Sequence, residues 1–524
     1  MEQNLIQKKQ IVDFFLKKNI LLSSDILDII KEADTQSIHN TIKEKTKSDT
    51  FLFLNKDLNE ALTNLPKLDT NWKDLEKSKA MLEKGKDGKI YHQFIQFLYE
   101  QKQKIEHEQV KIISSYEEES KKRNIQDFVK YFNARYRSLE KILRGRPELK
   151  SMTTINRIKN KKERETASIV GIVTEKRITK NGNLILVMED QTGSINVLIN
   201  KNKPDLFKEA SSIVLDEILG VSGVNGQNII FANGVVWPEL VAKDLKKSED
   251  ESYAIFLSDL HIGSNNFMPD AFNKFLSWIN CQVGNEQQKS IASKVKYVFI
   301  VGDMVDGCGI YPGQEDELVI KDIYDQYTEC ARLLSKIPTS VKIIMCPGNH
   351  DAMRIAEPQL KLYPDFAKPL YELPNIISVS NPAFVNIHSS ETFSGFDVLM
   401  YHGYSFDYFV ANVDDIRNKG GYDRADLIMK FLLKRRHLAP THTSTLYIPD
   451  TEHDPLVIDK VPDFFITGHI HKSIAANYKN ITLISGSCWQ AKTAFQEKVG
   501  HNPEPGRVPI VNLKTSEIKI LKFL

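Results

Sequence analysis

Five short apolar runs in the second half of the chain each lead directly into Asp, His or Asn residues. The runs are rich in β-branched and aromatic side chains, a composition typical of buried strands. In an open α/β sheet, ligands gather where loops leave the carboxyl ends of the strands, so these runs predict one sheet edge that carries the polar residues. The runs are Tyr253–Leu257, Tyr297–Val301, Val341–Cys346, Val398–Tyr401 and Asp463–Thr467.

The loops that follow the runs carry the side chains of a metal site. In chain order they read SDLH at 258–261, GDMVD at 302–306, PGNHD at 347–351, HG at 402–403 and GHIH at 468–471. Each motif alone is more often structural, because a single His after a strand usually packs and a Gly-Asp pair usually forms a turn. Five such loops at one predicted edge indicate a binding site.

The residue types in these loops suit two neighbouring divalent cations. Cations about 3.5–4 Å apart can hold both the attacking and the leaving oxygen of a phosphoryl displacement. Cations that close need an anion between them, and the carboxylate of Asp303 is the natural bridge. Neutral imidazoles complete each shell without adding charge, and a mixed N and O set suits Mn, Fe or Zn better than Ca or Mg.

The order DxH, GDxxD, GNHD, HG and GHxH resembles the calcineurin-like metallophosphoesterase family, and all five motifs are intact. The resemblance implies that one cation binds Asp259, His261, Asp303 and His471. It implies that the other binds Asp303, Asn349, His402 and His469. It also implies that His350 acts as acid or electrostatic partner of the phosphate and the leaving oxygen, with Asp351 orienting it. Arg354 is a candidate phosphate contact, with a structural salt bridge as the alternative.

Length and composition restrict the class of protein. A chain of 524 residues predicts two to four domains. The net charge of +2 gives no global signal for nucleic acid, so such binding would depend on local patches. Five cysteines without a CxxC pair fit a reducing compartment, and no apolar stretch reaches the length of a membrane span. The start MEQNLIQKKQ is too polar for a signal peptide, so we expect a cytoplasmic, nucleoid-associated protein without a membrane partner.

The patterns ahead of the first metal motif divide the rest of the chain. We expect a helical module at 1–65, a polar tether at 66–123, a helix and basic linker at 124–165, an OB-fold at 166–240 and the phosphoesterase at 250–524. The apolar cluster at 51–54 is expected to close a small helical bundle. The apolar stripe from Ile125 to Leu143 predicts a core helix that is capped by Asn124 and stopped by Gly145.

The predicted OB-fold rests on five alternating strands with a connector between the third and the fourth. Hairpin signals stand at Asn181-Gly182 and Asn225-Gly226. Phe231 and Trp237 are the only aromatic residues of the strand region, so a structural or protein-docking barrel is at least as consistent as a strand-binding one. Ahead of the barrel, residues 144–164 carry eight Lys or Arg against two acidic residues. This run predicts either a solvated linker or a segment that binds the DNA backbone.

A helical module, an OB-fold and a phosphoesterase, in that order, resemble the B subunits of replicative DNA polymerases. With every metal ligand present, the chain resembles the small subunits of archaeal family-D DNA polymerases from about Asn124 to Leu524. Stretches outside the metal motifs support this resemblance: 127–136, 307–314, 435–440 and 505–509. The fold class is then multidomain α/β plus all-β, in which the phosphoesterase is a β-sandwich flanked by helices.

The resemblance implies a proofreading 3′-5′ exonuclease that hydrolyses terminal phosphodiesters with two divalent metal ions. We expect the two ions to be Mn²⁺, with Mg²⁺, Fe²⁺ and Zn²⁺ as alternatives. The implied partners are the large catalytic subunit of the polymerase, in a heterodimer, and DNA with a 3′ end. Contact with a sliding clamp stays open, because Leu521–Leu524 makes no convincing clamp-binding motif.

Three other functions share parts of this pattern. A non-catalytic scaffold B subunit would have the same architecture without turnover. A double-strand-break-repair nuclease uses the same metal motifs but normally begins with its phosphoesterase, unlike this chain. A small-molecule phosphodiesterase or protein phosphatase would need neither an OB-fold nor a helical module.

Overall fold

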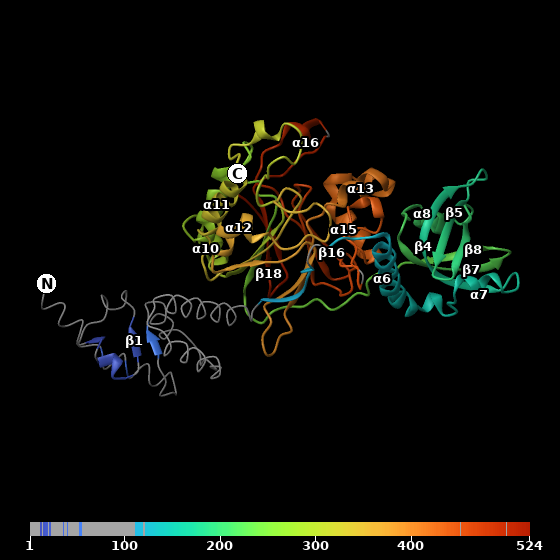
Figure 1. Ribbon diagram of the computed structural model, residues 1–524, viewed down its shortest axis with the longest axis horizontal. Coiled ribbons are helices and arrows are strands. Elements are labelled where there is room, and N and C mark those ends of the chain that lie inside the picture. Colours follow the sequence, from blue (N-terminus) through green and yellow to red (C-terminus); the bar gives the residue numbers. More distant parts are fainter. Residues whose placement is uncertain are drawn as a thin grey trace. The chain divides into compact units, whose positions relative to one another are not determined.

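A computed structural model describes residues 110–118, 121–450, 452–498 and 500–524, together with short pieces between residues 11 and 54. The chain divides into two compact units, Met1–Gln101 and Lys102–Leu524 (Figure 1). In the first unit, β1 (Ile20–Leu22) pairs in parallel with β2 (Leu52–Leu54). The prediction of a helical bundle is therefore wrong at 52–54, and most of the predicted helical module at 1–65 lies outside the described residues. None of the described helices is long and apolar enough to cross a membrane.

The phosphoesterase is built on two six-stranded sheets. The first has the order β12-β11-β10-β9-β18-β19, with β9 to β12 parallel. Its strands are β9 (Tyr253–Leu257), β10 (Val295–Val301), β11 (Lys342–Cys346), β12 (Ile376–Ser378), β18 (Arg507–Asn512) and β19 (Ile518–Lys522). The second has the order β16-β17-β15-β14-β13-β3. Its strands are β3 (Val110–Ser115), β13 (Ala383–Ile387), β14 (Phe396–Met400), β15 (Phe464–Thr467), β16 (Ile474–Tyr478) and β17 (Ile481–Ser485).

A shared apolar core joins the two sheets, and helices cover their outer faces. Phe256 and Phe299 of the first sheet and Phe464 of the second belong to the same buried cluster. Over the first sheet lie α9 (Pro269–Ile279), α10 (Glu286–Ala292), α11 (Ile323–Leu334) and α12 (Pro364–Tyr371). Over the second lie α13 (Phe406–Asn412), α14 (Asp414–Asn418) and α15 (Ala425–Arg435). The predicted sandwich flanked by helices is confirmed.

Short elements complete the chain. They are α16 (Ala494–Lys498), η3 (Pro147–Leu149), η4 (Gln314–Glu317), η5 (Gly421–Arg424) and η6 (His442–Ser444).

The predicted tether at 66–123 is wrong over residues 110–115, which form the edge strand β3. This strand pairs antiparallel with β13, from Val110 opposite Ile387 to Ser115 opposite Ala383. Only Val110 of its side chains is buried, and Ile112 and Ile113 are about half exposed. The strand lies within a stretch, 101–122, that is rich in Lys, Glu and Gln, and this surrounding composition led to the prediction of a tether.

The predicted core helix is α6 (Ile125–Arg144). Asn124 and Asp127 form a reciprocal capping box at its start, and Gly145 follows its end. The helix is fixed to the phosphoesterase through Asp454, which accepts hydrogen bonds from the Tyr131 hydroxyl at 2.7 Å and from Arg135 Nε at 2.6 Å. The apolar stripe predicted the helix but only part of its buried face: Leu139 and Leu143 are buried, whereas Ile125 and Val129 are exposed. It did not predict the ion pair.

Five strands close into the barrel that the sequence predicted as an OB-fold, in the order β4-β5-β6-β8-β7. They are β4 (Thr166–Ile178), β5 (Leu184–Asp190), β6 (Gly193–Ile199), β7 (Ile218–Gly226) and β8 (Ile229–Val236). Helix α8 (Pro204–Ser211) connects the third strand to the fourth, and α7 (Ile155–Lys159) precedes the first. The barrel contacts α15, where Arg435 bonds the fully buried Glu217 and Lys434 pairs with Glu209 at 2.9 Å.

Candidate metal centre

The loops that leave β9, β10, β11, β14 and β15 converge and bring all seven predicted metal ligands together. Three groups of donor atoms each lie within 4.8 Å of one another, and two of them consist of predicted ligands alone, while the third is His261, Asp306 and His350. The first group is Asp259, His261 and His471. The second is Asp303, His402 and His469. The seventh ligand, Asn349, joins the second group, since its Oδ1 lies 3.0 Å from His402 Nε2.

In the first group, two imidazole nitrogens face each other. Nε2 of His261 lies 3.1 Å from Nε2 of His471, and Asp259 Oδ1 lies 3.5 Å from the latter. Nδ1 of His261 is 2.9 Å from Asp306 Oδ1, and an ionised carboxylate only accepts, so Nδ1 carries the ring hydrogen. The Nε2 lone pair therefore points into the cluster. Nitrogens this close must share a proton or a cation, and the donor set fits a divalent cation.

In the second group, three candidate ligand atoms converge. Nδ1 of His402 donates to the Val301 carbonyl at 2.8 Å, which leaves Nε2 as the ligand atom. That Nε2 faces Asp303 Oδ2 at 3.2 Å as well as the Asn349 oxygen. Burial disfavours the charged ring, yet the adjacent Asp303 carboxylate raises the pKa of His402 to about 10, so Nε2 holds a proton when no cation is bound and offers its lone pair only when a cation replaces that proton. The site thus has a strongly negative field that a cation would neutralise.

Asp303 lies between the two groups. Its Oδ2 lies 3.2 Å from His402 Nε2 in one group and 3.9 Å from His261 Nε2 in the other. The side chain is almost fully buried, and its Oδ1 accepts the backbone N–H of His350 at 2.8 Å. This position suits a carboxylate that bridges two cations.

Five of the candidate ligands have left-handed backbone conformations. Their φ values are 52° for Asp259, 50° for His261, 52° for Asp303, 72° for His469 and 53° for His471. Such values cost roughly 1–3 kcal/mol each for non-glycine residues and persist where the surroundings enforce them, often at functional sites. The fold therefore maintains strain at the residues that point into the cluster.

Glycines in the metal motifs allow the loops to approach one another. A Cβ on Gly302 would lie 2.2 Å from Nδ1 of His402, and one on Gly348 would lie 2.2 Å from Asp303 Oδ1. Both distances are far below van der Waals contact. The Gly-Asp and Gly-Asn pairs are therefore required by packing against the ligands of neighbouring loops, and not only by the turns that they form.

His350 stands beside the cluster with one ring nitrogen fixed. Its Nδ1 lies 2.8 Å from the carbonyl oxygen of Asp306, so Nδ1 carries a hydrogen and Nε2 is the atom left for a substrate. Its ring meets the His261 ring edge-on, with 4.7 Å between centroids. Burial lowers the pKa of His350.

The predicted role of Asp351 as the orienting partner of His350 is wrong, because the Asp306 carbonyl occupies that position. The Asp351 carboxylate instead accepts the backbone N–H groups of Gly348 at 2.8 Å and Met304 at 3.2 Å. Burial, with Asp303 nearby, raises its pKa to about 7. Asp351 therefore positions the loops after β10 and β11 relative to each other.

Arg354 is engaged by the main chain. Its Nε and Nη2 donate to the carbonyl of Pro358 at 3.2 and 2.6 Å, and its guanidinium lies 5.7 Å from the ring centroid of Tyr116. These contacts replace the predicted alternative of a structural salt bridge.

Three residues that hold the candidate ligands were not assigned from the sequence. Asp306 bonds His261, Asp407 Oδ2 lies 3.0 Å from His469 Nε2, and the Gln496 amide lies 2.9 Å from His471 Nδ1. Asp306 is the second Asp of GDMVD, so its motif position was a usable signal. Asp407 and Gln496 come from α13 and α16, and only the folded chain brings them to the site.

Comparison with known protein families finds matches to two domains of the chain. Residues 254–473 match the family described as calcineurin-like phosphoesterase. Residues 167–247 match the family described as OB-fold nucleic acid binding domain.

Long matches are found to proteins named DNA polymerase II small subunit. That of Methanothermobacter thermautotrophicus is 42% identical over 399 residues, which cover 76% of this chain and 80% of the relative. That of Archaeoglobus fulgidus is 37% identical over 390 residues, which cover 74% of this chain and 75% of the relative. That of Pyrococcus furiosus is 38% identical over 403 residues, which cover 76% of this chain and 64% of the relative.

Proposed function

This chain belongs to the family of DNA polymerase II small subunits, and we propose that its phosphoesterase domain is a proofreading 3′-5′ exonuclease. The resemblance to small subunits of archaeal polymerases is thereby confirmed, whereas the activity is our proposal. One observation carries it: seven buried or half-buried donors form two groups around Asp303, and none of the expected ligands has been replaced.

The donor set implies which residues would hold two divalent cations. One cation would take Asp259, His261, Asp303 and His471, and the other Asp303, Asn349, His402 and His469. Mn²⁺ fits this mixed N and O set first, with Mg²⁺, Fe²⁺ and Zn²⁺ as alternatives. When bound, the cations would polarise the terminal phosphodiester and stabilise its developing negative charge.

The chain's own residues orient the site and move a proton. Asp306 fixes the ring of His261, and Asp407 contacts that of His469, so each ring keeps its direction. Nε2 of His350 would deliver a proton to the departing 3′ oxygen, while Nδ1 stays bonded to the Asp306 carbonyl. Burial makes the His350 imidazolium a stronger acid, and an anionic phosphate beside it would favour the protonated form. Arg354 would meet the phosphate through Nη1, because Nε and Nη2 are bound to Pro358.

The substrate is proposed as DNA with a frayed 3′ end. A mispaired terminus unpairs at little cost, so its strand can leave the duplex and reach the site. The proposed partner is the large catalytic subunit of the polymerase, in a heterodimer.

The test is an exonuclease assay on a 3′-mismatched primer, with Mn²⁺ and with or without the large subunit. Asp303→Ala and His350→Ala should abolish cleavage while association with the large subunit persists. His453→Ala serves as the matched control, since this His is 61% exposed and lies outside the cluster. Undiminished cleavage by both variants would refute the assignment. If the unaltered heterodimer cleaves no DNA, the proposed exonuclease is refuted and the non-catalytic scaffold subunit is the remaining alternative.

A further inference from the structure

The basic segment at 144–164 is not a solvated linker, because its apolar residues are anchored in the barrel. Ile155 and Ile158 are fully buried and belong to the barrel core. Leu149 is 2% exposed and packs so tightly over Gly220 of β7 that a Cβ there would lie 2.4 Å from its Cδ1. The sequence left two interpretations open, a solvated linker and a segment that binds the DNA backbone, and this packing excludes the solvated linker.

The main chain of the segment is also bonded to two turns of the barrel. The N–H of Ile155 donates to Asp190 Oδ2 at 2.8 Å, beside the turn between β5 and β6. Asn225, beside the turn between β7 and β8, donates from Nδ2 to the carbonyls of Lys161 at 3.1 Å and Lys162 at 3.2 Å. Its own carbonyl accepts the N–H of Arg164 at 2.8 Å. The segment therefore has a defined course around the barrel.

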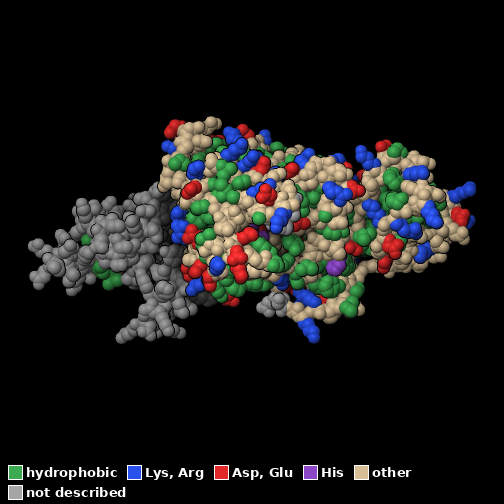
Figure 2. Space-filling model, turned by 90° about the horizontal axis from the view of Figure 1, so that it is seen from above, with side chains coloured by type: hydrophobic (Ala, Val, Ile, Leu, Met, Phe, Trp, Pro, Cys, Tyr) green, Lys and Arg blue, Asp and Glu red, His purple; other side chains and the backbone are tan. Residues whose placement is uncertain are grey.

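Six of the eight cationic side chains of this segment are exposed, whereas Arg146 and Lys161 are half-buried and donate to the carbonyls of Glu239 and Thr166. Those that are exposed are Arg144, Lys150, Arg157, Lys159, Lys162 and Arg164. Of the eight Lys and Arg, Arg144 alone forms an ion pair with a described residue, Glu140 at 2.7 Å. Figure 2 shows Lys and Arg side chains spread over the barrel end of the molecule, at the right of the view.

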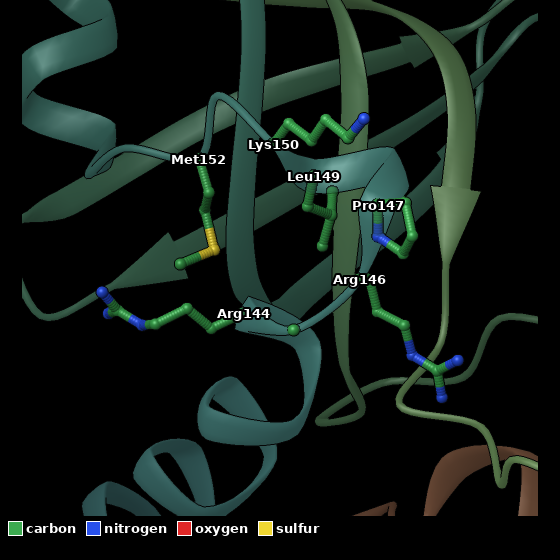
Figure 3. Close-up of a pocket in the computed structure, with 7 residues that line it drawn as sticks. Arg144, Arg146, Pro147, Leu149, Lys150 and Met152 are labelled. Carbon is green, nitrogen blue, oxygen red and sulfur yellow. The ribbon is translucent and has the colours of Figure 1, made fainter.

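Three of the cations surround one hollow. Arg144, Arg146 and Lys150 line a cavity of about 400 Å³ where α6 ends against the barrel, and no acidic residue lines it. Figure 3 shows their side chains extending in different directions around the turn that contains Pro147 and Leu149. Of the three, only Arg144 is paired with an acidic residue, Glu140, so the hollow keeps a net positive charge that would favour an anionic ligand.

We propose that the Lys and Arg side chains of residues 144–164, here called the basic collar, bind the phosphodiester backbone of DNA. A rigid set of cations displaces the counterions of a polyanion without the cost of ordering a main chain. No large apolar side chain of these residues is exposed, so the collar lacks the apolar anchors that dominate protein interfaces. DNA is the polyanion favoured here, because the chain belongs to a family of DNA polymerase subunits.

The proposal does not depend on hydrolysis at the metal centre, and its test separates the two. Binding of the full-length chain to a fluorescent, 3′-recessed DNA is measured by anisotropy in EDTA, at a series of salt concentrations. A quadruple variant removes exposed cations of the collar: Lys150→Ala, Arg157→Ala, Lys159→Ala and Lys162→Ala. A matched control removes four cations beside the helices of the first sheet: Lys274→Ala, Lys289→Ala, Lys321→Ala and Lys336→Ala.

Each cation that contacts a phosphate contributes about 0.9 to the slope of log K against log salt concentration. The collar variant should therefore lower that slope by up to about 3.6 and weaken binding more than tenfold, whereas the control should leave both unchanged. Replacing the three lysines by Arg, with Arg157 kept, should retain binding, because the charges remain.

Equal slopes for the collar variant and the control would overturn the proposal. So would unchanged DNA binding accompanied by weaker association with the large subunit, which would identify the collar as a protein interface. A heterodimer that cleaves no DNA would overturn the proposed exonuclease activity but would not affect the proposal that the basic collar binds DNA.

Discussion

Replacing Arg135 by Met should destabilise the docking of α6 by several kcal/mol. Arg135 is 1% exposed and pairs through Nε with the equally buried Asp454 at 2.6 Å. Its guanidinium lies 4.9 to 5.1 Å from the ring centroids of Tyr131, Phe132 and Tyr447, a volume that a Met side chain can fill. The main loss is then electrostatic, since the Asp454 carboxylate stays buried without its cation. Breaking one side of a buried pair costs about 3–5 kcal/mol.

Hydrogen exchange followed by mass spectrometry measures this loss, because it reports opening of α6 and of the segment around Asp454 separately from the other domains. At one tenfold change per 1.4 kcal/mol, amides of α6 should exchange about 100- to 5,000-fold faster in Arg135→Met. Adding Asp454→Leu should restore most of the protection, because the stranded charge is removed. Exchange at the original rate in the single variant, or no recovery in the double variant, would refute the reasoning.

Three further predictions concern pH and the metal centre. Burial, with Arg135 nearby, lowers the pKa of His437 to about 4, so protonation opposes folding and the melting temperature should drop as pH falls from about 6.5 toward 4. His437→Gln should show a smaller drop over that interval, and an equal drop would count against this role. Asp306→Asn should weaken Mn²⁺ binding about 10- to 100-fold in calorimetric titration, because the ring of His261 loses its anionic partner; an unchanged affinity would contradict this. Gly348→Ala should abolish Mn²⁺ uptake, because the new Cβ would lie 2.2 Å from Asp303 Oδ1, and full uptake would show that the loops can separate.

The fold could be predicted wherever apolar periodicity was strong. The strands before each metal motif are buried along their length, and the apolar stripe of α6 has helical spacing, so composition and spacing predicted these elements. The stripe did not predict which side of α6 is buried, because Ile125 and Val129 are exposed. The edge strand β3 was not predicted, because only one of its side chains, Val110, is buried and the strand is otherwise held by pairing with β13. The strand β2 was read as helical because a continuous apolar run of four residues has no period that separates helix from strand.

The candidate metal ligands could be predicted from the sequence, but the residues that hydrogen-bond to them could not. Asp and His after buried strands are visible in a sequence, and the parallel topology brings them to one edge. The hydrogen bonds that fix the rings depend on α13 and α16, whose positions a motif does not encode. The role of Asp351 was wrong for the same reason: adjacency to His350 in sequence did not bring its carboxylate to the ring.

Metal stoichiometry tests the central claim most directly. The purified chain is loaded with Mn²⁺, freed of excess metal, and analysed by plasma mass spectrometry beside Asp303→Asn. If Asp303 bridges two cations, the unaltered chain should hold two equivalents and the variant should hold less than one, with its fold intact by circular dichroism. A single equivalent in the unaltered chain, or two in Asp303→Asn, would contradict a centre built around this carboxylate.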